Sequence, residues 1–307
     1  MIASAPVSAP VLAGCQVGAN PIIWSNDDFN DLAGDVPLDV ILREMRAAGF
    51  AGTELGHAYP RTTEALGAAL RRHDLQLVSG WHSTYLAAGD HASEEKNFQA
   101  HLALLQSLGA PVVIVAECTR CVHGDKAARL GFGADDRPLL TEAEWGRLGA
   151  GLAKFAALSA AAGLKLVYHH HMGTVIQSEA ELDRLLAGVP AMHLLFDPGH
   201  LAFAGIDPLA VARRHAPRIA HVHLKSVRRE VAERVRREGW SFYRAVREGV
   251  FTIPGDGMVD FPALFAVLAQ HHYRGWLVVE AEEDPVRVAA LPKAKKAREF
   301  VRTHAGV

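Results

Sequence analysis

The chain has 307 residues, of which 50% are hydrophobic and 21% are charged, so it carries ample apolar material for a large core. Its formal net charge of −2 does not favour a partner selected by bulk charge, such as DNA or an anionic membrane surface. No stretch approaches the ~18 consecutive apolar residues of a membrane span. We therefore expect neither nucleic acid nor membrane among the partners.

Residues 1–14 lack the basic and apolar blocks of a signal peptide, so we expect a flexible tail there and one folded unit over 15–307. Cys15, Cys118 and Cys121 are too few for a disulfide framework. Cys118 and Cys121 have the C-x-x-C spacing of some redox and metal sites, but no second pair accompanies them. We therefore expect all three cysteines to be reduced thiols of a cytoplasmic protein, because disulfides are rare in the cytoplasm.

Apolar segments typical of strands alternate along the chain with segments typical of helices. Pro37 opens the first expected helix. Thr141 and Glu144 have capping-box spacing, which predicts a helix from Thr141 to about Ala162. Longer insertions follow the fourth strand, at 119–140, and the seventh strand, at 228–253. The eight expected strands are 16–23, 52–56, 75–80, 112–116, the histidine stretch 164–173, 194–197, 219–224 and 276–280.

Eight such alternations at a spacing of roughly 30 residues predict a parallel sheet covered by helices. A closed (β/α)8 barrel, the TIM barrel, accommodates eight units better than an open doubly wound sheet does. No G-x-G-x-x-G sequence follows the first strand, so dinucleotide binding is not favoured. The sequence therefore predicts an α/β protein with a single barrel domain.

Polar side chains gather at the ends of the expected strands, which in such barrels share one mouth where chemistry takes place. The fifth strand ends in His169, His170 and His171, and side-chain alternation directs His169 and His171 to one face and His170 to the other. Strand ends elsewhere carry further candidates: Glu54, His57, Trp81, His82, Glu117, Asp197, His200, His221, His223, Lys225, Glu280 and Glu282.

A set of histidine, aspartate, histidine and glutamate from four adjacent strands predicts a cage for one divalent ion. Imidazole and carboxylate ligands suit manganese, iron, cobalt or zinc, and the absence of thiolates in the set disfavours a structural zinc site. Alternation alone leaves two choices open, His169 or His171 on the fifth strand and His221 or His223 on the seventh.

Several stretches of the chain resemble the xylose-isomerase-like barrel superfamily of sugar isomerases, epimerases and endonuclease IV. The combination of VYHHHMGT at 167–174 with FTIPGDG at 251–257 resembles its inosose dehydratase group most closely. The other matching stretches are ANPIIWSNDD (19–28), GFAGTELGHAYP (49–60), LLFDPGHLAFAG (194–205), HVHLKSVR (221–228) and GWLVVEAEEDP (275–285).

This resemblance implies a divalent metal, Mn²⁺ or Co²⁺, held by four ligands that are Glu, Asp, His and Glu in many members of the superfamily. Carried over by position, the ligands are His169, Asp197, His223 and Glu280, with histidine in place of the first glutamate. The implied reaction is loss of water from 2-keto-myo-inositol (scyllo-inosose), giving a trihydroxycyclohexane-1,2-dione in inositol catabolism. The small-molecule partner is thus a cyclic polyol ketone.

The identity of the general base and acid stays open among five residues, and a second set is expected to bind the polyol. We expect the catalytic residues to be Glu54, His171, His200, Lys225 and Glu282. We expect the substrate-binding residues to be Trp24, Asn26, Asp27, His57, His82 and Glu117.

Three alternative functions remain. A metal-dependent ketose isomerase or epimerase shares the early enolisation step with a dehydratase. A DNA repair enzyme like endonuclease IV needs a basic groove, which the balanced charge disfavours. A metal-free binding barrel is the third. A homo-oligomer is compatible with the sequence, which does not determine the oligomeric state.

Overall fold

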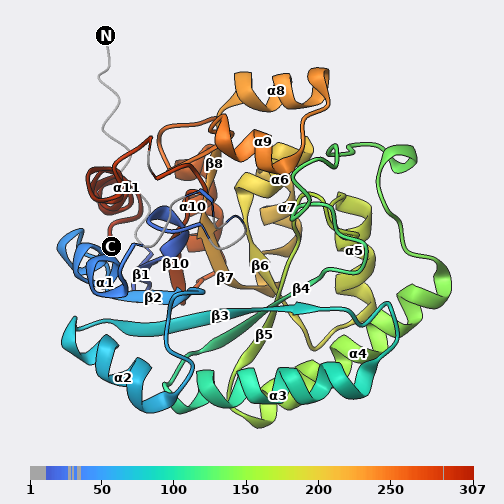
Figure 1. The fold of residues 1–307 in the computed structure, drawn as a ribbon, viewed down its shortest axis with the longest axis horizontal. Helices are drawn as coiled ribbons and strands as arrows, with labels where there is room; N and C mark the ends of the chain where they lie inside the picture. The colour runs from blue at the N-terminus through green and yellow to red at the C-terminus, as the bar shows by residue number, and fades with distance from the viewer. Residues whose placement is uncertain (1–11, 27–28, 30, 33–35, 286) are drawn as a thin grey trace.

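The computed structural model describes residues 12–26, 29, 31–32, 36–285 and 287–307. Within these residues, eight parallel strands close a barrel in the order β1-β10-β7-β6-β5-β4-β3-β2 (Figure 1). The predicted single (β/α)8 barrel is therefore confirmed. The barrel strands are β1 (Gln16–Ala19), β2 (Gly52–Leu55), β3 (Gln76–Thr84), β4 (Val112–Glu117), β5 (Lys165–His169), β6 (His193–Phe196), β7 (Ile219–Leu224) and β10 (Trp276–Val279).

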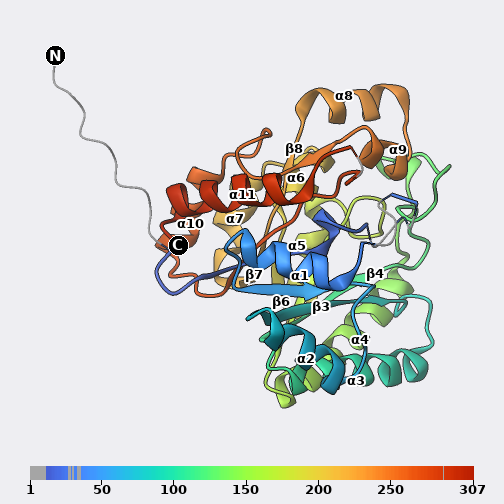
Figure 2. The same cartoon turned by 60° about the vertical axis from the view of Figure 1, so that its left-hand side comes forward.

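Helices lie around the outside of the barrel, and the long α3 and α4 run side by side along one flank (Figures 1 and 2). Among the described helices, none combines the length and apolar character that crossing a membrane requires. The helices are α1 (Leu38–Ala47), α2 (Thr63–Arg72), α3 (His91–Ser107), α4 (Glu142–Ala161), α5 (Glu179–Gly188), α6 (Pro198–Ala204), α7 (Pro208–His215), α8 (Arg229–Glu238), α9 (Phe242–Arg247), α10 (Phe261–Gln270) and α11 (Ala290–Ala305).

Two small apolar clusters fill the barrel interior, apart from the large core between strands and helices. Trp276 occupies one side of the interior, and Gly52 makes room for it, since a Cβ there would lie 2.8 Å from the indole. Such packing makes the barrel a solid support and leaves only its mouth for chemistry. The clusters consist of Val112, Ile114, Val167 and Leu195, and of Val78, Trp276 and Val278.

Three strands end several residues away from their predicted ends. β5 stops at His169, although the predicted segment continued to Gly173. β1 ends at Ala19 and not at Ile23, because the Asn20 side chain accepts a hydrogen bond from Ile22 N (2.9 Å) and starts a short 3-10 helix. β3 continues to Thr84, four residues beyond the predicted end at Gly80. The extension pairs Trp81 to Thr84 with β4 in register.

Helix caps fix the positions of two elements near the mouth. The predicted capping box at Thr141 and Glu144 is confirmed at the start of α4. Asp197 caps α6, because its Oδ1 accepts hydrogen bonds from Gly199 N (2.8 Å) and His200 N (3.0 Å). This cap holds the Asp197 carboxylate rigidly at the end of β6.

The segments that follow β4 and β7 meet above the barrel. The segment after β7 contains an antiparallel pair, β8 (Ser226–Val227) and β9 (Phe251–Thr252), together with α8 and α9 (Figure 2). Leu130 N donates a hydrogen bond to Trp240 O (3.0 Å), which joins the two segments. Phe242 of α9 contacts the loop that follows β5 and begins with His170 and His171, which we call the histidine loop. The centre of its ring lies 5.2 Å from that of the His171 ring.

Glu117 holds the tops of β3 and β4 together from the outer face of the barrel. Its Oε2 accepts hydrogen bonds from Thr84 Oγ1 (2.9 Å) and Leu86 N (3.0 Å), and its Oε1 accepts from Ala87 N (3.4 Å). Burial raises the pKa of Glu117, and hydrogen bonds from Thr119 and Thr84 oppose that rise.

We predict that Glu117→Gln lowers the free energy of unfolding by about 1–3 kcal/mol, because the amide group cannot accept all the hydrogen bonds that the carboxylate accepts. Urea unfolding followed by circular dichroism measures the loss. Glu248→Gln, at an exposed position at the end of α9, is the control and changes stability by less than about 0.5 kcal/mol. Equal effects of the two substitutions would contradict a bracing role for Glu117.

Candidate active site and metal centre

Four side chains from four neighbouring strands converge at the barrel mouth. His169 ends β5, Asp197 follows β6, His223 lies in β7 and Glu280 follows β10. Asp197 Oδ2 lies 3.4 Å from both His169 Nε2 and His223 Nδ1, and Glu280 Oε2 contacts His223 Nδ1. One ligand atom from each residue lies within 4.8 Å of the other three. The structure thus brings together the four residues predicted as metal ligands, which we call the quartet.

The quartet fits a divalent cation. Within the described residues, Asp197 Oδ2, His223 Nδ1 and Glu280 Oε2 are buried and make no hydrogen bond. Burying carboxylates is costly unless positive charge lies nearby. Lys225 supplies part of that positive charge, because its Nζ lies 2.7 Å from Glu280 Oε1 and 3.6 Å from Asp197 Oδ2. Two imidazoles and two carboxylates are also the donor types that Mn²⁺, Co²⁺ and Zn²⁺ accept.

Glu54, at the end of β2, holds His223 from the side opposite the quartet. Its oxygens lie 2.7 Å from Asn20 Nδ2, Ser79 Oγ and His221 Nε2, and 3.2 Å from His223 Nε2. Burial raises the pKa of Glu54, but the charge of His223 and then the hydrogen bond from His221 lower it well below its usual value. The Glu54 side chain is therefore ionised.

An ionised carboxylate only accepts hydrogen bonds, so His223 Nε2 carries a proton and Nδ1 presents its lone pair to the quartet in the neutral ring. Burial lowers the pKa of His223, but the carboxylates of Glu280 and Glu54 together raise it well above its usual value when no cation is bound. Glu54 accepts four hydrogen bonds already, which makes it an orienting group. The predicted role of Glu54 as a base therefore does not fit its position.

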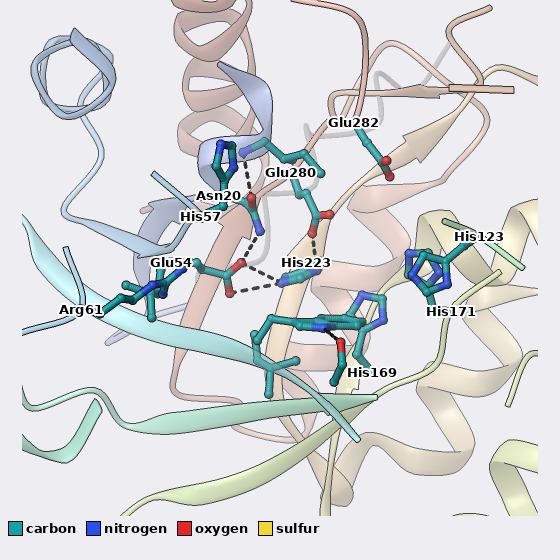
Figure 3. Close-up of a pocket in the computed structure, with 15 residues that line it drawn as sticks. Asn20, Glu54, His57, Arg61, His123, His169, His171, His223, Glu280 and Glu282 are labelled. Carbon is teal, nitrogen blue, oxygen red and sulfur yellow. Dashed lines mark hydrogen bonds and ion pairs between the residues drawn. The ribbon is translucent and has the colours of Figure 1, made fainter. Parts of the chain in front are cut away.

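A cavity of about 300 Å³ opens beside the quartet (Figure 3). This volume is ordinary for a small-molecule site. Of the predicted site residues, the cavity is lined by Glu54, His57, His169, His171, His223, Glu280 and Glu282. It is also lined by residues outside the predicted sets of ligand, catalytic and substrate-binding residues: Asn20, Ile22, Leu55, Arg61, Trp81, Ser83, Ile114 and His123.

Two of these additional residues, Trp81 and Ser83, lie on the extension of β3. Side chains on a strand alternate, and Ser79 already faces the barrel interior, where it bonds to Glu54. Continuing the strand by the same parity places Trp81 and Ser83 inward. Trp81 was predicted as a strand-end candidate without a specific role, whereas Ser83 was missed because the strand was predicted to end at Gly80.

The same parity corrects two predicted substrate contacts. His82 points outward, where its ring packs 5.5 Å from Phe98 of α3 and 6.4 Å from Phe155 of α4. Burial, and then the neighbouring His101, lower the pKa of His82 to about 4. Glu117 also faces outward and bonds to the β3 end described above. Neither residue lines the cavity.

The predicted contacts from the loop after β1 are also corrected. Trp24 is buried and its indole Nε1 donates a hydrogen bond to Glu44 of α1 (2.8 Å). Asn26 Oδ1 accepts a hydrogen bond from Phe29 N (2.8 Å), which stabilises the loop itself. Neither lines the cavity. Asp27, the third predicted residue of this loop, lies outside the described residues.

His171 lies on the cavity wall in a defined tautomer. Its Nδ1 lies 2.8 Å from Met172 O, and because a carbonyl oxygen only accepts, Nδ1 carries the proton. Burial, and then the charge of His123, lower the pKa of His171 well below its usual value. The ring is therefore neutral near pH 7 and its Nε2 is a proton acceptor.

His200 and Lys225 lie behind this wall and do not line the cavity. Both are buried, with His200 Nε2 3.0 Å from Lys225 Nζ and the His200 ring 3.9 Å from the His171 ring. Their predicted direct catalytic roles do not fit these positions. The structure places them as supports for His171 and for the quartet carboxylates.

A second cluster lies in the segment after β4, where Cys118, Cys121 and His123 have ligand atoms within 4.8 Å of one another. All the cysteines are free thiols. Hydrogen bonds from Cys118 and then His123 lower the pKa of Cys121 to about 4, while the hydrogen bond with Cys121 raises the pKa of Cys118. Sequence analysis recognised the two cysteines but not His123, which follows them by two residues.

Comparisons with known proteins agree on a family. The family model of the xylose isomerase-like TIM barrel matches residues 42–304. An inosose dehydratase of Clostridium tetani (strain Massachusetts / E88) is 39% identical, and one of Geobacillus thermodenitrificans (strain NG80-2) is 42% identical. Each alignment covers 95% of this chain and 98% of the relative.

A solved structure of the IOLI protein with a bound zinc atom has the same fold. Its TM-score is 0.65 and its sequence is 13% identical, over 95% of this chain and 98% of that one. The barrel, the family model and the full-length similarity therefore lead to one conclusion. The chain belongs to the inosose dehydratases, a family of enzymes built on the xylose isomerase-like TIM barrel.

Proposed function

We propose that this enzyme dehydrates 2-keto-myo-inositol (scyllo-inosose) in inositol catabolism. The reaction removes a proton from the carbon beside the ketone and expels the hydroxyl group of the next carbon. The resulting enol tautomerises, so one substrate gives one trihydroxycyclohexane-1,2-dione and one water. Similarity of about 40% to inosose dehydratases over nearly the whole chain supports the substrate class. The observation that carries the proposal is the buried quartet on the wall of a small-molecule cavity.

We propose that the quartet holds Mn²⁺ or Co²⁺. When bound, a divalent ion polarises the ketone and stabilises the developing enolate, a contribution of several kcal/mol. The two nitrogens and two carboxylate oxygens of the quartet supply the ligands. Lys225 and Glu54 fix the orientation of Glu280 and His223 through the contacts given above.

His171 takes the α-proton on Nε2 and Glu282 protonates the departing hydroxyl group. Both side chains line the cavity (Figure 3). The Nδ1 hydrogen bond to Met172 O fixes the acceptor tautomer of His171 before the substrate arrives. The proton from the α-carbon of the substrate is thus transferred to His171 Nε2, which carries no proton in the resting enzyme.

The polyol is gripped by donors and acceptors on the remaining cavity wall. Asn20, His57, Arg61 and Ser83 supply polar groups, and Trp81 supplies an indole for the apolar face of the cyclohexane ring. The Trp81 ring lies 5.3 Å from that of His169 and 6.0 Å from that of His171, so it borders both groups that act on the substrate. A cytoplasmic location accords with three free thiols.

We predict that Asp197→Asn and Glu280→Gln each lose the bound divalent ion and nearly all activity, because each removes one anionic ligand from the quartet. Elemental analysis after dialysis measures the metal content, and circular dichroism checks the fold. Glu54→Gln is the comparison, since it leaves all four ligands in place. It weakens metal affinity by about 10–100-fold without abolishing binding. Full metal content in Asp197→Asn would refute the quartet as the metal site.

We also predict that His171→Asn and Glu282→Gln separate the two proton transfers. Each lowers kcat by about 10²–10⁴-fold. In D₂O, Glu282→Gln still exchanges the α-proton of scyllo-inosose for deuterium, because the base remains, whereas His171→Asn does not. Nuclear magnetic resonance of the recovered substrate measures the exchange. Exchange in His171→Asn but not in Glu282→Gln would instead make Glu282 the base and His171 the acid.

A matched control comes from His57, which lines the cavity but is given no proton-transfer role. His57→Asn raises KM and leaves exchange and kcat within about tenfold of the wild type. Dione formation is followed by its ultraviolet absorbance. Interconversion of ketoses without any dione would favour the isomerase or epimerase alternative, and nicking of abasic DNA would favour a repair enzyme.

A further inference from the structure

We propose that Cys118, Cys121 and His123 form a second metal site for a thiophilic divalent cation such as Zn²⁺, separate from the quartet. The three residues form the sequence C-x-x-C-x-H directly after β4. Their two sulfur atoms and one imidazole nitrogen lie within 4.8 Å of one another. Tetrahedral zinc with bonds of about 2.0–2.3 Å separates its ligand atoms by about 3.5–3.8 Å. Side-chain shifts of about 1 Å therefore bring the three ligand atoms to this spacing and leave the fourth position of the tetrahedron open.

The backbone already holds the three ligands in a compact turn. Cys121 N donates a hydrogen bond to Cys118 O (3.1 Å), and Arg120 between them has a φ of 54°, in the left-handed region. That conformation is costly for a residue other than glycine. Arg120 is held in it by Glu144, with Nη1 2.5 Å from Oε1 and Nη2 3.1 Å from Oε2.

A second contact docks the turn onto the histidine loop. Val122 N donates a hydrogen bond to Gly173 O (2.7 Å). Gly173 has a φ of 79°, and a Cβ at that position would lie 3.0 Å from His123 N. The His123 ring then lies 4.9 Å from the His171 ring (Figure 3). His123 therefore brings one edge of the cluster to the cavity wall. The cluster stands on a fixed support, as a metal site requires.

The two sites differ in chemistry. The cluster offers two sulfur ligands and one imidazole, which favour soft or borderline cations. The quartet offers no sulfur and retains two carboxylates, which suit harder cations such as Mn²⁺. One protein can thus bind two different ions at neighbouring places, sorted by ligand type.

Cobalt(II) distinguishes the sites, because only cobalt bound by thiolate gives an intense charge-transfer absorption in the near ultraviolet. We expect this absorption when the metal-free, phosphine-reduced wild-type protein is titrated with Co²⁺. Asp197→Asn, which damages the quartet, retains the absorption. The double variant Cys118→Ser/Cys121→Ser loses it and binds one equivalent of Co²⁺ fewer than the wild type.

Cys15→Ser provides the matched control. Cys15 is also a buried cysteine, but its Sγ bonds to Tyr273 O (3.4 Å), at the start of β1 and away from the cluster. This variant retains the charge-transfer absorption in full. Circular dichroism and thermal unfolding show that each variant is folded before its titration is interpreted.

Two outcomes overturn the proposal. One is a folded wild-type protein, with all its thiols free by chemical titration, that shows no charge-transfer absorption at saturating Co²⁺. The other is an absorption of undiminished intensity in the folded double variant. Zn²⁺ that displaces Co²⁺ from the wild type and bleaches the absorption supports the assignment to a thiophilic divalent cation.

Discussion

Three carboxylates buried together at the barrel mouth are the constraint on which the rest of this structure depends. Glu54, Asp197 and Glu280 are each 6% exposed or less. Separating such groups from water is costly unless cations and hydrogen-bond donors surround them. Lys225, the imidazole groups and the proposed ion supply that compensation. Eight closed strands then supply the rigid frame that keeps so many polar groups in place.

Three ligands of the quartet each contact the surrounding protein with one side-chain atom and face the metal site with another. Asp197 Oδ1 caps α6, while Oδ2 faces the quartet. His223 Nε2 bonds to Glu54, while Nδ1 faces Glu280. Glu280 likewise places Oε1 on Lys225 and Oε2 on His223. The protein therefore fixes ligand orientation before any ion binds, which is how a site gains affinity without flexible rearrangement.

Strand alternation explains both what the sequence predicted and what it missed. His169 and His223 were correctly placed at one mouth because parallel strands of a closed barrel end on the same side. His82 and Glu117 were misplaced because each stands one residue out of phase with the inward positions. Arg61 and His123 could not be placed at all. They lie in loops, whose positions depend on tertiary contacts such as the hydrogen bond from Val122 N to Gly173 O.

The histidine at position 169 changes the charge balance of the centre. A glutamate there, as in many members of the superfamily that the chain resembles, would give three carboxylates among four ligands. With His169 neutral, Asp197 and Glu280 supply two negative charges, which match the two positive charges of the proposed ion. Burial lowers the pKa of His169, so its ring accepts a cation and not a proton. Fewer anionic ligands would leave more of the proposed ion's positive charge to act on a ketone oxygen, which would favour removal of an α-proton.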